Sequence, residues 1–402
     1  MTKNFCATID AVITLKRRAA EQIGCNVTLL TKIFRTVIIM KKSLRKLLAA
    51  ALIAGSFFTA SPVNAEVKTY EGTDEYVMSE FETIDIAKQR ARQKAERNAQ
   101  EKAGVYISSY SETKNLELVS DEIVSIACGI LSVVDVKYDV TPLADVNGFA
   151  IRATVKANIE TDDVNKWLQK NGQEKSTFVM RNKELQQAVD EQNATIEKLK
   201  AQVEKLKADG KLSGKRDREQ VTEEFAAEDK NFLATQKLDE AQKKFYNRDY
   251  NAAIKLCDES IKILPTARAY AGRGGAYGYL KNFTQTVADC SNAIELDPNY
   301  AMAYNNRGSA LGYLGNYEQA MDDICRAIEL DPNFALAYNN RAALCLMAGN
   351  LEQAFDDANR AIFLDPKLDL PYMVRGTCYQ QAGDFAKAQA DFDKARELGY
   401  NG

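Results

Sequence analysis

Four prolines recur at a nearly constant interval and place the strongest constraint on the fold. They are separated by 33, 34 and 34 residues, and the sequence between them is self-similar: Pro265, Pro298, Pro332 and Pro366. A repeat of this length is one helix pair that cannot bury its apolar face alone, so neighbouring units must stack. The spacing therefore predicts a solenoid of helix pairs, with units 234–266, 267–300, 301–334, 335–368 and a last unit from Asp369.

Small and aromatic residues keep one register within units two to five. The fourth position holds Tyr270, Tyr304, Tyr338 and Tyr372, and the eighth holds Gly274, Gly308, Ala342 and Gly376. Unit one matches only in its second half. This register, together with the terminal proline, resembles the tetratricopeptide repeat family. The resemblance implies an α-solenoid of about five repeats over 231–402.

One arginine and one aspartate also recur in units two to five, the first in the first helix and the second in the second helix. The arginines are Arg273, Arg307, Arg341 and Arg375, and the aspartates are Asp289, Asp323, Asp357 and Asp391. A catalytic arginine would not be needed four times. We therefore predict a structural ladder of ion pairs or hydrogen bonds that joins neighbouring helices.

The resemblance also implies a concave groove lined by the first helix of each unit. Carried over to this chain, it predicts a peptide-binding groove that includes Asn305, Asn306, Ser309, Tyr313, Asn339, Asn340 and Met347. Amides can pair with a peptide backbone, and Tyr and Met supply adaptable apolar surface. The alternative is that the asparagines are solvated polar residues. The lysine and asparagine that the family's carboxylate-binding variant uses in its first repeat are missing, so that specificity is not implied.

The composition excludes several functions. The 402-residue chain contains no histidine, which rules out a Ser-His-Asp or Cys-His arrangement and a histidine-ligated zinc site. Its eight cysteines form no Cys-x-x-Cys pair, so neither a metal nor a cofactor is implied. A net charge of −3 without a basic block gives no basis for nucleic-acid binding. We expect no enzymatic activity; an enzyme would need a centre of carboxylates, cysteine or lysine, and no such cluster is found.

A basic and apolar segment lies near the N-terminus. From Met40 the chain reads MKKSLRKLLAAALIAGSFFTASPVNA, in which an apolar run follows basic residues and Val63-Asn64-Ala65 ends the segment. This order predicts a signal peptide at 40–65, cleaved after Ala65 and too short for a comfortable membrane span. Residues 1–39 are predicted to be a mis-assigned extension. The alternative is a genuine long N-terminal region or a retained signal anchor.

Residues 66–168 are predicted to form a small α+β domain. An alternating stretch is followed by a helix from Glu82 to Ala103, stopped by Gly104, a strand beginning at Val105, a short helix from Ser120, and two strands joined by an Asn-Gly turn. The alanine face of the long helix resembles the N-terminal domain of flagellar assembly protein T and related envelope lipoproteins. Its basic residues are interpreted as a solvated surface, with an acidic partner as the alternative.

Residues 170–210 show a heptad pattern. The seam is Leu185, Val189, Gln192, Ile196, Leu199, Val203 and Leu206, with β-branched residues at every a position of this set. This pattern favours a parallel two-stranded coiled coil, and hence a homodimer through 178–206. The alternative is a single solvated helix between two domains. Asn182 and Gln192 are expected to fix its register, and residues 211–230 are predicted to be a linker.

These features describe a mainly α protein with a small α+β domain, a coiled-coil helix and a C-terminal solenoid. We expect an exported protein of the periplasm or cell envelope that binds protein or peptide partners through its groove. The alternative is an assembly factor whose α+β domain docks on an envelope machine while the repeats act as a spacer. The six cysteines after residue 65 are interpreted as small buried residues, with a disulfide framework as the alternative.

Overall fold

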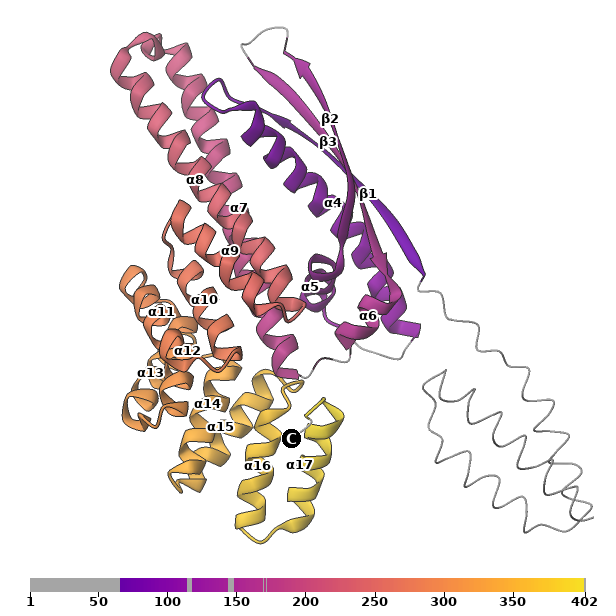
Figure 1. Ribbon diagram of the computed structural model, residues 1–402, viewed down its shortest axis with the longest axis vertical. Coiled ribbons are helices and arrows are strands. Elements are labelled where there is room, and N and C mark those ends of the chain that lie inside the picture. The colour runs from indigo at the N-terminus through magenta and orange to yellow at the C-terminus, as the bar shows by residue number, and fades with distance from the viewer. Residues whose placement is uncertain (1–65, 114–117, 144–147, 169, 171, 401–402) are drawn as a thin grey trace, which may run out of the picture. The chain divides into compact units, whose positions relative to one another are not determined.

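The computed structural model describes residues 66–113, 118–143, 148–168, 170 and 172–400 (Figure 1). The extension at 1–39 and the signal peptide at 40–65 lie outside these residues, so both stay predictions. The residues from Ala65 onward form one compact unit. Within the described part of the chain, no helix combines the length and apolar character needed to cross a membrane.

The α+β domain contains a three-stranded antiparallel sheet. Its strands are β1 (Val67–Val77), β2 (Ser132–Pro142) and β3 (Phe149–Glu160), in the order β1-β3-β2. The central strand β3 alternates buried and more exposed residues along almost its whole length, as expected of a sheet with one covered face. The two strands expected on either side of the Asn-Gly turn are confirmed as β2 and β3, which pair antiparallel from Pro142–Phe149 to Ser132–Asn158 with a register shift between Val133 and Asp135.

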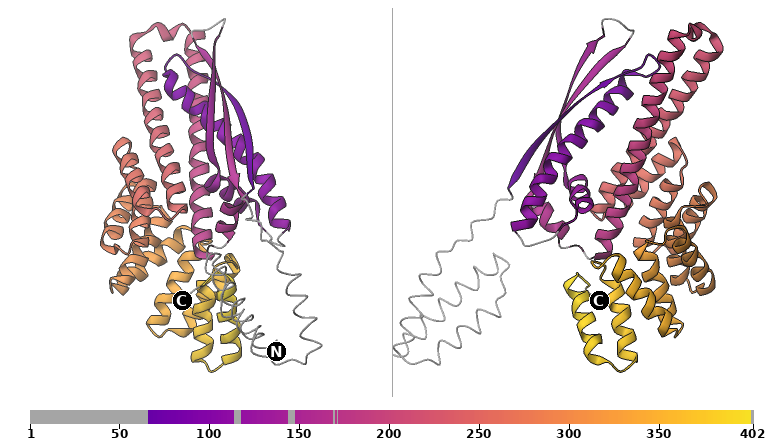
Figure 2. Two further views of the ribbon diagram at one scale, coloured as in Figure 1. Left: turned by 45° about the vertical axis from the view of Figure 1, so that its right-hand side comes forward. Right: turned by 180° about the vertical axis from the view of Figure 1, so that it is seen from behind.

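Helix α4 (Ile84–Thr113) covers one face of this sheet, as Figure 2 shows. Its alanine face is fully buried: Ala87, Ala91, Ala95, Ala99 and Ala103. Small side chains let the helix lie close to the strands, and Gly72 of β1 has no room for a side chain, because a Cβ there would lie 2.0 Å from the Ala95 carbonyl oxygen.

The predicted helix stop at Gly104 and the strand beginning at Val105 are wrong, because α4 continues for two more turns. Ile107 extends its buried face and is fully buried. Gly104 serves a close approach instead of a helix end, since a Cβ at this position would lie 3.3 Å from Ile123. Ile123 belongs to α5 (Ser120–Ile130), the short helix expected there. Helix α6 (Thr161–Leu168) follows β3.

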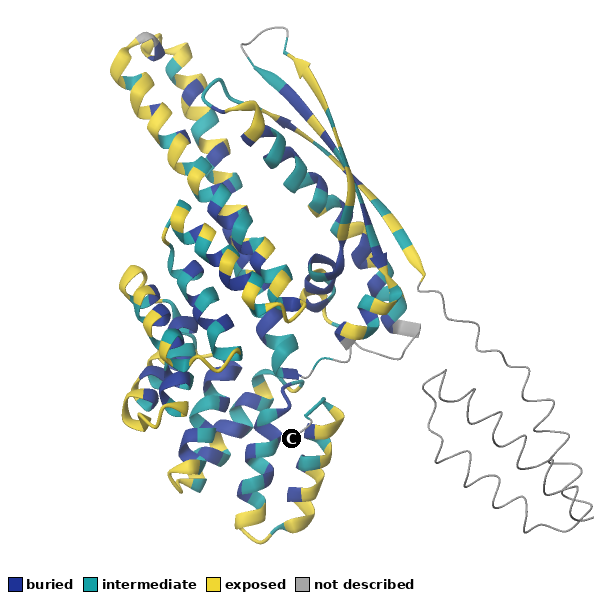
Figure 3. Ribbon diagram, viewed as in Figure 1, coloured by how far each residue is buried: buried dark blue, intermediate teal, exposed yellow. Residues whose placement is uncertain are grey.

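Helices α7 (Gly172–Ala208) and α8 (Lys215–Tyr246) form a long hairpin, joined through a short 3-10 turn at Lys211–Ser213. The linker predicted at 211–230 is therefore a helix for most of its length. Its few apolar residues fall on one face, where Val221 and Phe225 are almost fully buried, and its many charged residues face outward (Figure 3). A sparse apolar stripe is sufficient because α7 and the α+β domain cover it.

The heptad seam of α7 is covered within the same chain. Ile196 and Val203 belong to the core shared with the sheet and α4, and Leu185 packs against α8 and the first repeat. The two amides expected to set the register of a dimer are also used internally. Asn182 donates to Ser125 of α5 at 3.3 Å, and Gln192 donates to Thr235 of α8 at 2.6 Å. A parallel homodimer through 178–206 would have to replace these contacts.

One basic residue of α4 is not part of a solvated surface. Arg90 is buried, lies 2.9 Å from Asp229 of α8 and 3.4 Å from Glu82, and has the ring of Phe232 below its guanidinium. Tyr76 of β1 donates to the same Glu82 carboxylate at 2.5 Å. This buried network joins the sheet, α4 and α8, so the two interpretations of the basic residues both fail for Arg90.

The repeat region is a succession of helix pairs. The first pair is the end of α8 with α9 (Tyr250–Ile263), and the others are α10 (Ala267–Tyr279) with α11 (Phe283–Leu296), α12 (Ala301–Tyr313) with α13 (Tyr317–Leu330), α14 (Ala335–Met347) with α15 (Leu351–Leu364), and α16 (Leu370–Gln381) with α17 (Phe385–Glu397). The predicted solenoid is confirmed. The cysteines in the described residues are all free, and burial raises the pKa of Cys257 and Cys290 to about 12, which suppresses their thiolate forms.

Candidate functional site: a groove walled by helix α7

The recurring arginines and aspartates pair within each repeat. Each arginine donates from both Nε and Nη2 to the two oxygens of the aspartate 16 residues later, at 2.7–2.9 Å. The four pairs are Arg273–Asp289, Arg307–Asp323, Arg341–Asp357 and Arg375–Asp391. All four aspartates are buried, so each carboxylate depends on its two-pronged hydrogen bond for its charge to be satisfied.

The remaining guanidinium nitrogen of each arginine reaches the preceding repeat. Nη1 of Arg307 donates to Ser291 at 3.1 Å and Nη1 of Arg375 donates to Asn359 at 2.9 Å. Asp258 and Cys325 occupy the equivalent places for the other two arginines. Each arginine thus joins both helices of its own repeat to the second helix of the one before. The hydrogen bond to the aspartate raises the pKa of the arginine, which stays charged.

The N-terminal half of α7 lies against the concave side of the repeats. Met180 packs beside the apolar cluster of α12, α13 and α14. Arg181 fills the space above Gly275 of α10, where a Cβ would lie 2.0 Å from its Nη2 atom. The backbone N–H of Gln173 donates to Asp369, in front of α16, at 3.2 Å. Helix α7 therefore follows the inner face of the array across several repeats.

Between α7 and the repeats remains an open groove of about 510 Å³. Five of the predicted groove residues line it: Asn305, Asn306, Ser309, Tyr313 and Asn340. Asn339 is buried next to the groove and does not line it, and Met347 is largely exposed outside it. Residues that the repeat pattern did not single out complete the lining, chiefly Thr177 and Arg181 of α7, Lys281 of the α10–α11 turn and Phe283 at the start of α11.

The four asparagines of the groove region form a chain of side-chain hydrogen bonds. Asn339 donates to Asn340 at 3.4 Å, Asn340 donates to Asn305 at 2.9 Å, and Asn305 donates to Asn306 at 3.4 Å. The last amide nitrogen, Nδ2 of Asn306, is buried and has no hydrogen-bond partner among the described residues. A buried donor without an acceptor is costly. The amide chain therefore ends at a residue that lines the groove and whose buried donor is unpaired among the described residues.

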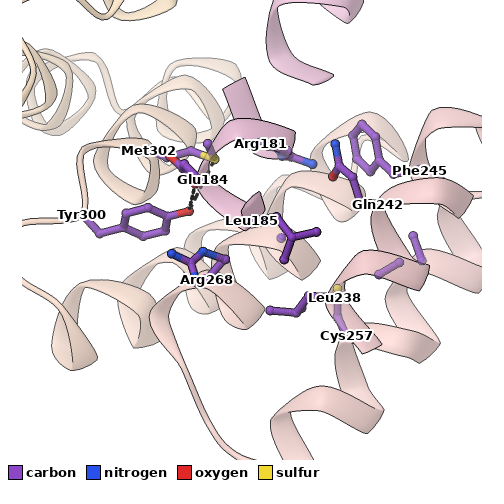
Figure 4. Close-up of a pocket in the computed structure, with 13 residues that line it drawn as sticks. Arg181, Glu184, Leu185, Leu238, Gln242, Phe245, Cys257, Arg268, Tyr300 and Met302 are labelled. Atoms are coloured by element: carbon purple, nitrogen blue, oxygen red, sulfur yellow. Dashed lines mark hydrogen bonds between the residues drawn. The ribbon is translucent and has the colours of Figure 1, made fainter. Parts of the chain in front are cut away.

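A second, smaller cavity lies where α7 meets α8, α9 and α10. Figure 4 shows Arg181, Glu184 and Leu185 of α7 pointing toward it, and its volume is about 40 Å³. Tyr300, in front of α12, donates to Glu184 at 2.7 Å across this contact. Burial raises the pKa of Glu184. A space of this size accommodates water rather than a ligand, so we interpret it as part of the interface between α7 and the repeats.

Lys281 stands at an unusual backbone position. The turns between the paired helices of repeats three to five place Gly315, Gly349 and Gly383 in the left-handed region, with φ of 84°, 78° and 81°. Lys281 takes the same place in repeat two with φ of 59°. A side chain in this conformation is strained, whereas glycine is not. The departure of Lys281 from glycine was visible in the sequence. Nothing in the heptad pattern of α7 identified Arg181.

The described residues contain no cluster of three or more acidic or cysteine side chains placed to hold a metal ion. The fold and the groove together define a helical-repeat protein with a concave binding surface. Its C-terminal region is an array of tetratricopeptide repeats: two family models, both described as tetratricopeptide repeat, match residues 301–334 and 326–356. The first match coincides with the third unit derived from the proline spacing.

The curated relatives match short stretches of the chain. Small glutamine-rich tetratricopeptide repeat-containing protein 2 of Saccharomyces cerevisiae is 44% identical over 62 residues, which is 15% of this chain and 18% of that protein. Sperm-associated antigen 1 of Rattus norvegicus is 37% identical over 70 residues, 17% of this chain and 8% of that protein. The chain thus spans less than a fifth of the length of these relatives.

Among solved structures, MamA of Desulfovibrio magneticus covers 41% of this chain and 94% of its own, with 20% identity and a TM-score of 0.35. A thermophilic tetratricopeptide-repeat protein of Thermus thermophilus covers 41% and 91%, with 19% identity and a TM-score of 0.38. Tetratricopeptide-repeat proteins generally mediate protein–protein interactions, and none of the similarities indicates catalysis or nucleic-acid binding.

Proposed function

We propose that this chain is a non-enzymatic adaptor that binds a protein or peptide in the groove between α7 and the repeats. The observation that carries the proposal is the open groove of about 510 Å³, which is lined by the amides of Asn305, Asn306 and Asn340. The groove also offers apolar surface, since Tyr313 is 73% exposed and its ring stacks on Phe283 with centroids 4.6 Å apart. Backbone-pairing amides beside aromatic rings suit a peptide ligand.

Site-specific photo-crosslinking in cells tests this proposal. A crosslinking amino acid at Tyr313 should capture a partner, which mass spectrometry then identifies. The matched control is the same substitution at Tyr317, which is 52% exposed at the start of α13 and does not line the groove. Equal capture from both positions, or capture from neither, would contradict groove binding.

We also propose that the protein is exported and acts in the periplasm or cell envelope. The signal-like segment at 40–65 supports this proposal. N-terminal sequencing of the protein recovered from fractionated cells should yield Glu66 as the first residue. A mature protein that retains residues before Met40, or one recovered only from the cytoplasmic fraction, would contradict export and the assignment of the start.

The alternative role, in which the α+β domain docks on an envelope machine, stays a prediction. The resemblance of this domain to the N-terminal domain of flagellar assembly protein T also stays a prediction. The α+β domain and the repeats are in contact, which argues against repeats that act only as a spacer. Lys367, between α15 and α16, lies 2.6 Å from Glu122 of α5, and α7 packs against both regions. A crosslinker at Lys137, on the exposed part of β2, would capture the partner if this alternative holds.

A further inference from the structure

We infer that the groove selects an acidic segment of its partner, recognised by Arg181 of α7 and Lys281 of the α10–α11 turn. This inference rests on the proposed function and specifies the chemistry of the ligand. Both cations line the same groove, one from outside the repeats and one from within repeat two. The segment would place a carboxylate between them and an apolar side chain against the aromatic rings at Phe283 and Tyr313.

The charge of the groove differs from that of the chain. The protein carries 56 acidic and 53 basic residues, yet the only charged side chains among the described residues that line the groove are Arg181 and Lys281. Neither cation lies within 4 Å of a carboxylate of the described residues, in contrast to the four ladder arginines. Glu184, one turn along α7 from Arg181, is the carboxylate that interacts with it electrostatically, but it lines the smaller cavity and not the groove. Two cations that form no ion pair and share a groove without acidic side chains favour an anionic ligand.

Arg181 is held in place by its surroundings. Its guanidinium lies 4.4 Å from the centroid of the Phe245 ring of α8 and above Gly275 of α10. Its Nε atom is buried and has no hydrogen-bond partner among the described residues. A guanidinium fixed by stacking loses little freedom when a carboxylate arrives, and its fork suits two-pronged recognition. Asn306, whose amide donor is also unpaired, lines the same groove.

The backbone at Lys281 supports a role in binding. The equivalent turn of three other repeats has glycine, which adopts the left-handed conformation without strain. Lys281 retains a strained conformation while its side chain lines the groove. Residues in such conformations cluster at functional sites. Arg248 has the same conformation in repeat one, but it is paired with Glu174 at 2.8 Å and does not line the groove.

The inferred site differs from the carboxylate-binding variant to which the sequence offered no match. That variant uses basic residues of the repeats' own first helices, whereas Arg181 is contributed by α7. Helix α7 also packs against α5 and the sheet domain. An acidic ligand would therefore contact both α7, which packs against the α+β domain, and the repeats.

Peptide selection on the full chain tests the inference. A random peptide library is selected on the wild-type protein, and the enriched consensus peptide is synthesised with its acidic residues and with the isosteric Asn or Gln in their place. Fluorescence polarisation then gives both affinities. We expect enrichment of Asp or Glu next to an apolar residue. The isosteric peptide should bind at least about tenfold more weakly, because a charge-assisted hydrogen bond is lost.

Two variants locate the effect. Arg181→Met should weaken binding of the acidic peptide by about tenfold and leave the isosteric peptide unaffected. Lys281→Gly should weaken the acidic peptide and also raise the melting temperature, because glycine relieves the strained turn. Arg248→Gly is the matched control: it removes one positive charge from the equivalent turn and should leave the affinity unchanged.

The outcomes separate the two proposals. Selected peptides that lack acidic residues, but lose binding in a Tyr313→Ala variant, would overturn the acidic ligand and leave groove binding intact. Acidic peptides that bind Lys281→Gly and Arg248→Gly equally would also overturn it, because folding is not at risk in the glycine variant. Failure to enrich any peptide, or enriched peptides insensitive to every groove substitution, would overturn both proposals.

Discussion

Tyr300 donates a 2.7 Å hydrogen bond to Glu184, and this contact joins α7 to the loop before α12 over 116 residues of sequence. The hydroxyl group of Tyr300 is buried, and the side chain of Glu184 is partly buried in the same interface. The contact holds a helix from outside the repeats on the inner face of the array. The position of α7, and with it the shape of the groove, depends on contacts of this kind.

Tyr300→Phe should lower the stability of the protein. The substitution leaves the Glu184 carboxylate in a buried site without its donor, which costs about 1–3 kcal/mol in the free energy of unfolding. Urea denaturation measures this change. Tyr317→Phe is the control, since its hydroxyl is on an exposed side chain and its removal should change little. Equal stability of the two variants would show that α7 is not held by this bond.

The same site predicts a dependence of stability on pH. Burial raises the pKa of Glu184 in the folded state, so the folded protein binds this proton more tightly than the unfolded chain. Stability from this group is therefore present at low pH and lost as the pH rises from the unfolded pKa through the raised folded pKa. Relative to Glu184→Gln, the wild type should lose unfolding free energy as the pH rises above the ordinary glutamate pKa of 4.5 and through the raised pKa of the folded state. A difference independent of pH would contradict the raised pKa.

Arg307→Met should destabilise the repeat region. Asp323 would be left buried without its two-pronged partner, and we expect a loss of about 3 kcal/mol, the lower end of the range for broken buried pairs, because the Arg307 side chain is 24% exposed. Arg326→Met is the matched control on the exposed surface, where the arginine lies 3.0 Å from Glu329. If Arg307→Met leaves the melting temperature unchanged, the arginine–aspartate pairs do not contribute to the stability of the repeats.

Phe225→Ala tests the helical assignment of the segment whose sequence resembles a linker. Phe225 is fully buried and stacks near Phe81, with centroids 5.8 Å apart. Loss of a buried aromatic ring should reduce the unfolding free energy by about 3–5 kcal/mol. Phe363→Ala removes a ring that is 76% exposed and should have little effect. Two variants of equal stability would restore the linker interpretation.

Gly308→Ala tests the close approach of α12 and α13. A Cβ at Gly308 would lie 2.7 Å from Ile324 and 2.9 Å from the Ala320 carbonyl oxygen, so the helices would have to separate, at about 1–3 kcal/mol. Gly312→Ala lies on the same helix and meets only the flexible end of Leu344 at 3.3 Å. We expect the second variant to be neutral or slightly more stable, because alanine favours the helix. Thermal unfolding of both proteins distinguishes the outcomes.

The heptad pattern of α7 was informative about burial but not about the partner. An apolar stripe such as Leu185, Ile196 and Val203 predicts that one side of the helix is buried against another element. A second copy and a neighbouring helix of the same chain satisfy that requirement equally well. The helical nature of 215–230 was missed for a related reason, since two apolar residues in a charged segment are too few to set a period.

The extension of α4 past Gly104 illustrates a second limit. A glycine after a helical pattern is a common helix end, but it also permits close packing, and only the position of Ile123 in α5 distinguishes the two. Arg181 was missed because its role depends on its position above Gly275, which lies 94 residues later in the sequence.

The sequence by itself determined the repeats, the bounds of the third unit and the pairing partners of the recurring arginines. These features are local: Arg307 and Asp323 lie on adjacent helices 16 residues apart, and the period shows the same pair four times. Only the tertiary structure decided what lies in the concave groove. Helix α7 is placed there by contacts such as Glu184–Tyr300 that cross more than a hundred residues, and no periodic pattern records an interaction that occurs once.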